Sequence, residues 1–382
     1  MKSIKYFLFA LAMVAGIGGL IVSCTKDDAP NNGEPRILYV RVTNPASSDS
    51  LLVGAGQGQL IAIIGENLGG AVEVWFNDQQ ALLTPTYITN TSLLVSVPSQ
   101  IPIQVSNTLK IVFKNGHELL YDFEVQISAP VIKTMDCEFV NEGDVAVIRG
   151  DYFYEPLTVT FEGGVTGELV SVSDQEINVR VPAGAQPGKI TVTTNFGETK
   201  SGFLFRDDRP KFIDSDPYEG WWDGSLVVSN PGPNDPPKIS GNYLRYSNNV
   251  GSWSWKELAG GPASSMPNHS KNIPDEAFIK PSDYYLKFEV NTLKPYNGNL
   301  VKINVGLTSE DNGGYGWAPP FDTKGKWQTV AIPLDEVFAQ YATMPQANAG
   351  GYWARIVVGN APGAWDADIA FDNLRVVLKT VK

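Results

Sequence analysis

Tryptophan is the residue type whose number and placement in this chain point most directly to chemistry. The chain has nine tryptophans, and all but one of them lie beyond residue 210. An indole is a flat apolar surface with a single N–H donor at its edge. It can therefore cover the apolar face of a sugar ring while the N–H reaches a hydroxyl. The C-terminal part of the chain predicts an aromatic binding surface.

Two stretches supply the favoured ligand contacts. Trp317 lies in "EDNGGYGWAPPF", a run of turn residues that is not expected to bury large aromatics, and Tyr315 is its companion. Trp353 begins a strand beside a glycine-rich loop in "GGYWARIVVGN". Trp365 follows a Pro-Gly turn in "APGAWDADIAF", and its sequence leaves core and ligand contact equally open.

The remaining tryptophans are ambiguous or belong to the core. Trp221 and Trp222 are adjacent in "YEGWWDG", and because adjacent strand residues point to opposite faces, at most one is expected to meet ligand. Trp253 and Trp255 alternate with serine and lysine in "VGSWSWKELAG", so both indoles share one face of a strand. That face either packs into a core or binds ligand. Trp327 opens the alternating strand "WQTVAIPL" and is predicted to be core or sheet edge.

Polar and acidic residues near these aromatics have two expected roles. The polar residues expected to hold sugar hydroxyls are Arg355, Asn360, Asp311 and Asn312. The acidic residues that could give oxygens to a structural calcium ion are Asp366, Asp368 and Asp372, although a solvated acidic turn is favoured. No other metal and no cofactor is expected. Two cysteines and two histidines offer little for a Cys/His metal site or a histidine-dependent triad.

Charge and motif content weigh against two other function classes. The formal net charge is −12 and the basic residues are scattered, so no patch that could neutralise nucleic-acid phosphates is visible. A glycoside hydrolase needs two carboxylates across a cleft. The available carboxylates are Glu219, Asp223, Glu257 and Glu289. None lies in a catalytic motif, so an enzyme is not expected.

The composition predicts the elements that carry these residues. The chain has 37 glycines and 26 prolines, and its apolar runs are short and rich in Val, Ile and Thr. That pattern is typical of strands and turns and favours an all-β fold. The best helical stretch is 334–342, where Leu334, Val337, Phe338 and Tyr341 recur at helical spacing.

An internal repeat organises the middle of the chain. "GQLIAIIGENL" (58–68) aligns with "GDVAVIRGDYF" (143–153), and Phe76 and Phe161 follow at the same distance. The V-P steps at Pro98 and Pro182 also correspond. Each copy has about seven short alternating strands, the pattern of an immunoglobulin-like sandwich. These motifs resemble the IPT/TIG family over 36–127 and 129–206, which implies two tandem spacer domains, at 36–128 and 129–207.

The last segment, 208–382, is too long for a third repeat. Its strands, ending in "FDNLRVV", resemble the jelly-roll-like β-sandwiches of non-catalytic carbohydrate-binding modules. Pro35, Pro130 and Pro210 stand at the start of the three modules, and proline stiffens short junctions. A semi-rigid stalk that carries a larger C-terminal sandwich is therefore predicted.

The N-terminus predicts the location of the protein. Lys2 and Lys5 precede an apolar run that ends in "IVSC", which is the order of a secretory signal peptide over 1–23. "IVSC" resembles a bacterial lipobox with Cys24 as the lipidated residue, and "TKDD" resembles the export signal of surface lipoproteins in Bacteroidota. A plain cleaved signal peptide is the alternative. Residues 24–35 would form a tether, which leaves Cys137 as a small buried apolar residue. "DSL" resembles an O-glycosylation acceptor and leaves modification of Ser50 open.

Taken together, these features resemble the B-type surface glycan-binding lipoproteins of Bacteroidota polysaccharide-utilisation systems. The resemblance implies an outer-membrane, cell-surface protein that binds polysaccharide through its C-terminal domain and catalyses no reaction on it. The expected ligand is a β-glucan: mixed-linkage, β-1,3-linked or xyloglucan. The expected partners are a glycan transporter complex and surface glycanases. A surface adhesin that docks a protein is the alternative, because tryptophan also anchors protein interfaces.

Overall fold

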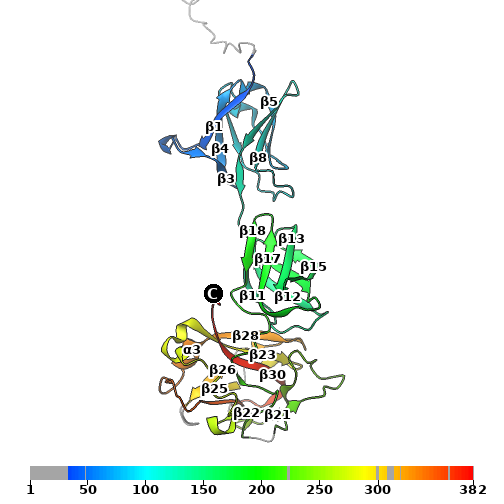
Figure 1. Ribbon diagram of the computed structural model, residues 1–382, viewed down its shortest axis with the longest axis vertical. Coiled ribbons are helices and arrows are strands. Elements are labelled where there is room, and N and C mark those ends of the chain that lie inside the picture. The colour runs from blue at the N-terminus through cyan, green and yellow to red at the C-terminus, as the bar shows by residue number, and fades with distance from the viewer. Residues whose placement is uncertain are drawn as a thin grey trace, which may run out of the picture. The chain divides into compact units, whose positions relative to one another are not determined.

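The computed structural model describes residues 33–381, apart from 48, 222–223, 298–300, 308–313, 319 and 360–361. Strands dominate, so the predicted all-β class is confirmed (Figure 1). The chain divides into two compact units, one ending at Ile127 and one beginning at Ser128. No helix among the described residues is long and apolar enough to cross a membrane. The predicted signal peptide, Cys24 and most of the tether lie outside the described residues.

The first unit is a sandwich of two antiparallel sheets. One sheet has the order β2-β1-β4-β7, with the bounds Leu51–Leu52, Arg36–Val42, Leu60–Glu66 and Ser92–Ser96. The other has the order β6-β5-β8-β9, with the bounds Gln79–Gln80, Ala71–Phe76, Thr108–Phe113 and Glu118–Asp122. A short parallel pair joins β3 (Gly54–Gly56) to β10 (Glu124–Gln126). Phe76 is buried edge-on against Phe123 between the sheets.

The second sandwich begins the second unit and repeats the first. One sheet has the order β11-β12-β16-β15, with the bounds Val131–Met135, Val145–Asp151, Glu176–Arg180 and Glu168–Ser173. The other has the order β14-β13-β17-β18, with the bounds Val165–Thr166, Leu157–Glu162, Gln186–Thr194 and Gly197–Lys200. Phe161, aligned with Phe76, is likewise buried edge-on against a second phenylalanine, Phe205. Three strands of the first sheet and all four of the second keep the same order in both sandwiches, as expected if one module is used twice.

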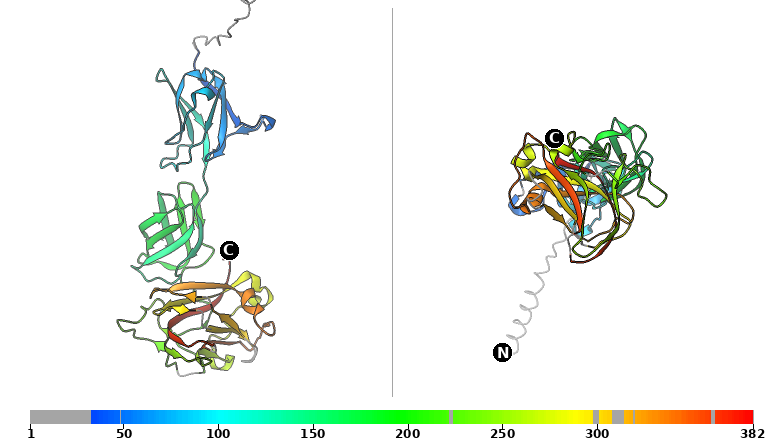
Figure 2. Two further views of the ribbon diagram at one scale, coloured as in Figure 1. Left: turned by 180° about the vertical axis from the view of Figure 1, so that it is seen from behind. Right: turned by 90° about the horizontal axis from the view of Figure 1, so that it is seen from below.

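The C-terminal sandwich pairs a six-stranded sheet with a four-stranded sheet. The six-stranded sheet has the order β20-β21-β30-β23-β28, with the bounds Val227–Val228, Tyr243–Val250, Trp365–Leu378, Tyr284–Thr292 and Gln328–Pro333. β19 (Lys211–Ile213) also pairs with β30, which Figure 2 shows in red. The four-stranded sheet has the order β22-β29-β25-β26, with the bounds Trp255–Gly261, Trp353–Gly359, Val301–Leu307 and Tyr315–Trp317.

Helical segments are few and short. A strand pair, β24 with β27, and the α-helices α2 and α3 complete the sandwich, at Tyr296–Asn297, Pro320–Phe321, Glu276–Ile279 and Leu334–Ala339. The described 3-10 turns are Pro45–Ser47, Leu68–Gly70, Pro85–Tyr87, Ala263–Ser265 and Pro281–Asp283. α3 buries Leu334, Val337 and Phe338, so the predicted helix is confirmed.

The second sandwich packs on the six-stranded sheet through the segment after β11. Cys137, buried as predicted, and Phe139 pack with three residues of the C-terminal sandwich: Tyr243, Trp327 and Ala370. Trp327 is therefore a core residue, as its sequence predicts, and its Nε1 donates to the carbonyl of Pro237 at 2.7 Å. The predicted boundary at residue 207 lies within this one compact unit.

Candidate ligand-binding site

Trp317 lies in the core, so the prediction that it contacts ligand is wrong. It is 3% exposed, stacks on Tyr296 at 5.0 Å and meets Phe288 edge-on at 5.5 Å. The turn-rich stretch around it forms the short strand β26, in which Trp317 pairs with Val301 of β25. Alternate residues of this strand point inward, and the inward positions hold Trp317 and Tyr315.

Tyr315 and Trp365 are buried as well, which corrects two more candidates. The Tyr315 hydroxyl donates to a Glu336 carboxylate oxygen at 3.3 Å. Trp365 begins β30 and packs edge-on against Tyr296 at 5.0 Å. These rings, together with Trp317, fill the space between the two sheets instead of forming a binding surface.

The exposed indoles are those that the sequence ranked second. Trp255 opens the edge strand β22 and is 60% exposed, and Trp253 in the preceding turn is 65% exposed. Trp253 has a φ of 56°, in the left-handed region that a bulky residue rarely adopts. Such a backbone stores roughly 1–3 kcal/mol of strain and is found most often at functional sites. Because Trp253 lies in the turn and not in β22, the prediction that both indoles share one strand face is wrong, and their exposure excludes the interpretation that they pack into the core.

Trp221 is the third exposed indole, at 47%. Its backbone N–H donates to the carbonyl of Gly260 at 2.9 Å, and its ring meets the half-buried Trp353 edge-to-face at 4.5 Å. Gly261 leaves room for the ring, because a Cβ at that position would lie 3.0 Å from the indole. The two candidates Trp221 and Trp353 therefore touch. Trp222 lies outside the described residues.

A groove of about 270 Å³ separates the Trp221 segment from the edge strand β22. One wall comes from the segment after Trp221 and the other from β22; the lining residues are Trp221, Gly224, Ser225, Leu226, Lys256, Glu257 and Leu258. An apolar ring, a hydroxyl, an ammonium and a carboxylate therefore converge on one open groove. Aromatic surface with a few convergent polar groups is the usual composition of a small-molecule or sugar site.

Glu257 connects this groove to Arg355, a residue that the sequence proposed as a polar contact. Glu257 pairs with Val357 in the neighbouring strand, and Arg355 is two residues before Val357, so all three share a face of the sheet. A guanidinium nitrogen of Arg355 lies 3.6 Å from the Glu257 carboxylate, and both side chains are largely buried. The pair holds the groove's carboxylate in a fixed orientation. Asn360, Asp311 and Asn312 lie outside the described residues.

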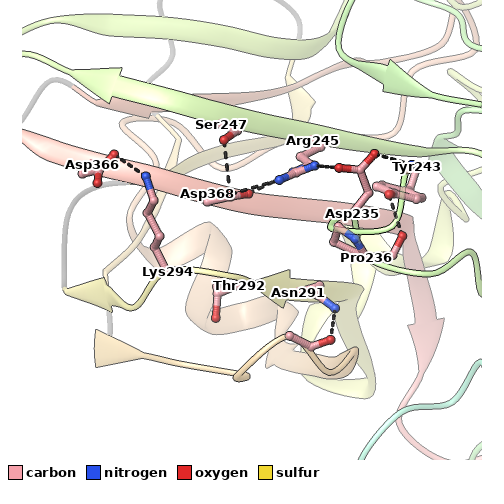
Figure 3. A network of polar contacts seen from close by, with 12 residues as sticks. Asp235, Pro236, Tyr243, Arg245, Ser247, Asn291, Thr292, Lys294, Asp366 and Asp368 are labelled. Atoms are coloured by element: carbon pink, nitrogen blue, oxygen red, sulfur yellow. Dashed lines mark hydrogen bonds and ion pairs between the residues drawn. The ribbon is translucent and has the colours of Figure 1, made fainter. Parts of the chain in front are cut away.

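Two of the three acidic residues proposed for calcium are paired with basic side chains. All three belong to strand β30 and not to a turn. Asp366 accepts from the Lys294 ammonium at 2.7 Å, and Asp368 accepts two bonds from the Arg245 guanidinium at 2.9 and 3.0 Å (Figure 3). Within the described part of the chain, no group of three or more His, Cys, Asp or Glu residues is placed to hold a metal ion.

The carboxylates considered for hydrolysis are held in structural contacts. Glu289 is fully buried against Arg375 at 2.7 Å, and burial raises the pKa of its carboxyl. Glu219 accepts the backbone N–H of Asn268 at 3.0 Å. Asp223 lies outside the described residues. Neither Glu289 nor Glu219 is among the residues that line the groove beside Trp221.

Comparison with known proteins gives one family and several similar chains. Residues 205–378 match the profile of the family described as the surface glycan-binding protein B xyloglucan binding domain. An IPT/TIG domain-containing protein of Bacteroides ovatus is 28% identical over 221 residues, which cover 53% of this chain and 43% of that protein. This chain therefore spans less than half the length of that curated relative.

Two solved structures share the fold. The surface glycan-binding protein PbSGBP-B of Prevotella bryantii superposes with a TM-score of 0.65 at 23% identity, covering 92% of this chain and 100% of that one. An SGBP-B from a complex xyloglucan utilization locus in Bacteroides uniformis gives a TM-score of 0.50 at 17% identity, covering 91% of this chain and 100% of that one. At these identities the likeness establishes the fold.

Proposed function

We propose that this chain binds a polysaccharide without catalysing a reaction on it, because residues 205–378 match the family model described as the surface glycan-binding protein B xyloglucan binding domain. The proposed ligand is a β-glucan, with xyloglucan first among the three expected glucans because the family carries that name. The proposed site is the groove along β22, with Trp221, Trp253 and Trp255 as the exposed platforms and Trp353 behind Trp221.

One observation carries this proposal: three indoles, each about half or more exposed, belong to the edge strand β22, to the turn before it and to the segment across the groove. Leaving large apolar side chains in water is unfavourable, and exposed apolar surface on this scale is typical of binding sites. Each aromatic contact to a ring contributes on the order of 1 kcal/mol. Several contacts together give roughly millimolar to micromolar affinity, which suits reversible capture of a long polymer.

The proposed location follows from the family and the N-terminal sequence. A surface glycan-binding protein acts at the cell surface, and lipidation of Cys24 would anchor this chain to the outer membrane. Buried acyl chains contribute about 0.8 kcal/mol per methylene. A glycan transporter complex and surface glycanases are the proposed partners, because captured polymer must be cut and imported before it is used.

The test is calorimetric titration of residues 25–382 with soluble xyloglucan, mixed-linkage β-glucan, β-1,3-glucan and a mannan. Saturable binding to a β-glucan is expected, with a loss of about tenfold in the Trp221→Ala and Trp255→Ala variants. Tyr87→Ala is the matched control, since Tyr87 is a half-exposed aromatic in the first unit, and it should bind like the parent.

Three results would overturn the proposal in different ways. Absence of binding to every glucan would favour the adhesin alternative. Binding that survives in both tryptophan variants would move the site away from the groove. Release of reducing sugar from a bound glucan would make the chain an enzyme.

A further inference from the structure

A short segment next to the groove connects the mostly buried carboxylate of Glu219 to the exposed indole of Trp221. The Glu219 carboxylate accepts the backbone N–H of Asn268 at 3.0 Å and also the side-chain amide of that residue. The His269 Nδ1 lies 3.1 Å from the same carboxylate, whose side chain is mostly buried. Glu219 therefore fastens the start of the segment to the turn that follows β22.

Trp221, two residues later, is held much less firmly. One backbone hydrogen bond, to Gly260, and one ring contact, to Trp353, hold it, while 47% of its surface stays exposed. Gly220 between the two residues lies against β22, since a Cβ there would lie 2.9 Å from the carbonyl oxygen of Gly260, the same oxygen that accepts the Trp221 N–H. A shift at Glu219 would therefore move the segment along β22 and with it the indole.

The charge on Glu219 gives its contacts their strength. Burial alone would raise the pKa of this carboxyl, but the hydrogen bonds from Asn268 and the neighbouring His269 outweigh burial and lower it. The group is therefore an anion at neutral pH, and bonds to an anion are about twice as strong as neutral ones. An amide in its place would set an N–H group against the donors of Asn268.

We propose that Glu219 is a positioning residue that fixes the angle between the Trp221 and Trp353 indoles, and that it sets glycan affinity through this angle. The effect of Glu219 on glycan affinity rests on the proposed function. The effect of Glu219 on the angle between the two indoles does not depend on any ligand. Glu219 itself does not line the groove.

The first readout is optical. Two indoles at 4.5 Å with their planes at 84° couple their excited states and give a couplet in far-ultraviolet circular dichroism. The size of this couplet depends on the angle between the rings. Trp221→Ala should abolish the couplet, which assigns the signal to this pair. Glu219→Gln should reduce it by half or more. Glu276→Gln, which removes an exposed carboxylate paired with Lys280 in the same sandwich, should leave it unchanged.

The second readout is a double-mutant cycle on glucan affinity in residues 25–382. Glu219→Gln should weaken binding about tenfold in the parent and have no further effect when Trp221 is already alanine. An equal loss in both backgrounds would overturn the proposal, because Glu219 would then act independently of Trp221. An unchanged couplet in Glu219→Gln would overturn it as well.

Two provisions keep the test decisive. If Glu219→Gln fails to fold, Asn268→Ala is used instead, because it removes the side-chain amide that donates to Glu219 and keeps the backbone N–H. This variant should reduce the couplet to an intermediate size. An unreduced couplet would overturn the proposal. If no glucan binds to the parent chain, the proposed function fails, while the couplet still decides whether Glu219 orients Trp221.

Discussion

At the scale of single residues, Asp372 carries a carboxyl group whose burial disfavours the ionised form. It is 2% exposed, and one oxygen accepts the backbone N–H of Asn373 at 2.8 Å. Its other oxygen has no hydrogen-bond partner within the described part of the chain. Burial, and then the neighbouring Glu289, raise its pKa well above the usual 3.8. The folded protein therefore keeps the Asp372 proton to a higher pH than the unfolded chain does.

This proton predicts how stability changes with pH. Between pH 3.8 and the raised pKa, the folded state binds more protons than the unfolded state, so the contribution of Asp372 to stability falls as pH rises. Asp372→Asn removes the ionisation and should raise the free energy of unfolding at neutral pH by about 1–3 kcal/mol. Denaturant unfolding from about pH 4 to pH 8 measures this, with the exposed Asp366→Asn as control. A less stable variant at neutral pH would contradict the prediction.

The different burial of two indoles predicts a large loss of stability for one tryptophan substitution and a small change for the other. Trp317→Ala should cost about 3–5 kcal/mol of unfolding free energy, because it leaves a cavity between Tyr296 and Phe288. Trp255→Ala should change stability by less than about 1 kcal/mol, since most of that ring is already in water. Equal stability of the two variants in denaturant unfolding would show that Trp317 is not a core residue.

The periodicity of apolar residues within one segment determines which of these residues could be assigned to core or surface from the sequence. α3 and the strands of the repeat follow from periodicity within each segment, so they were predictable. Trp317 was not, because its burial depends on Tyr296, which reaches it from a separate strand pair. Composition around Trp317 resembles a turn, and only the pairing of β26 with β25 makes it a strand. Exposure of an indole is likewise decided by distant neighbours.

At the scale of elements, the connection from β21 in the six-stranded sheet to β22 in the four-stranded sheet combines a strained turn with two exposed indoles, Trp253 in the turn and Trp255 at the start of β22. Residue 253 must adopt a left-handed φ of 56°, which glycine does without steric cost. The strained Trp253 therefore favours a role in binding over one in folding.

Two substitutions of Trp253 distinguish the effect of the turn's backbone on stability from the effect of the indole on binding. Trp253→Gly should be about 1 kcal/mol more stable than Trp253→Ala, because only alanine keeps the strain. Both should lose glucan affinity equally, because both lack the ring. Denaturant unfolding and titration of the two variants measure these effects. Retention of full affinity by either variant would exclude Trp253 from the site.

At the scale of the whole molecule, the two sheets of the C-terminal sandwich make different contacts. The six-stranded sheet packs against the second immunoglobulin-like sandwich, and the four-stranded sheet carries the groove on its edge strand. Glu138 of the second sandwich contacts Lys287 and Arg375 of the C-terminal sandwich, and all three side chains are buried. Glu138 and Arg375 are 237 residues apart, so no local pattern could have predicted this ion cluster.

The cluster predicts that these two sandwiches unfold together. Glu138→Ala leaves the Lys287 ammonium buried without the carboxylate it contacts, and removal of one partner from a buried ion pair costs about 3–5 kcal/mol. Asp136→Ala, in the same segment, breaks a pair with Arg149 that is open to water and should cost at most about 1 kcal/mol. Denaturant unfolding followed by tryptophan fluorescence reports the C-terminal sandwich, which holds most of the indoles. If the Glu138 variant shifted this transition no more than the Asp136 variant, the ion cluster would not couple the sandwiches. The C-terminal sandwich would then owe its stability to its own core.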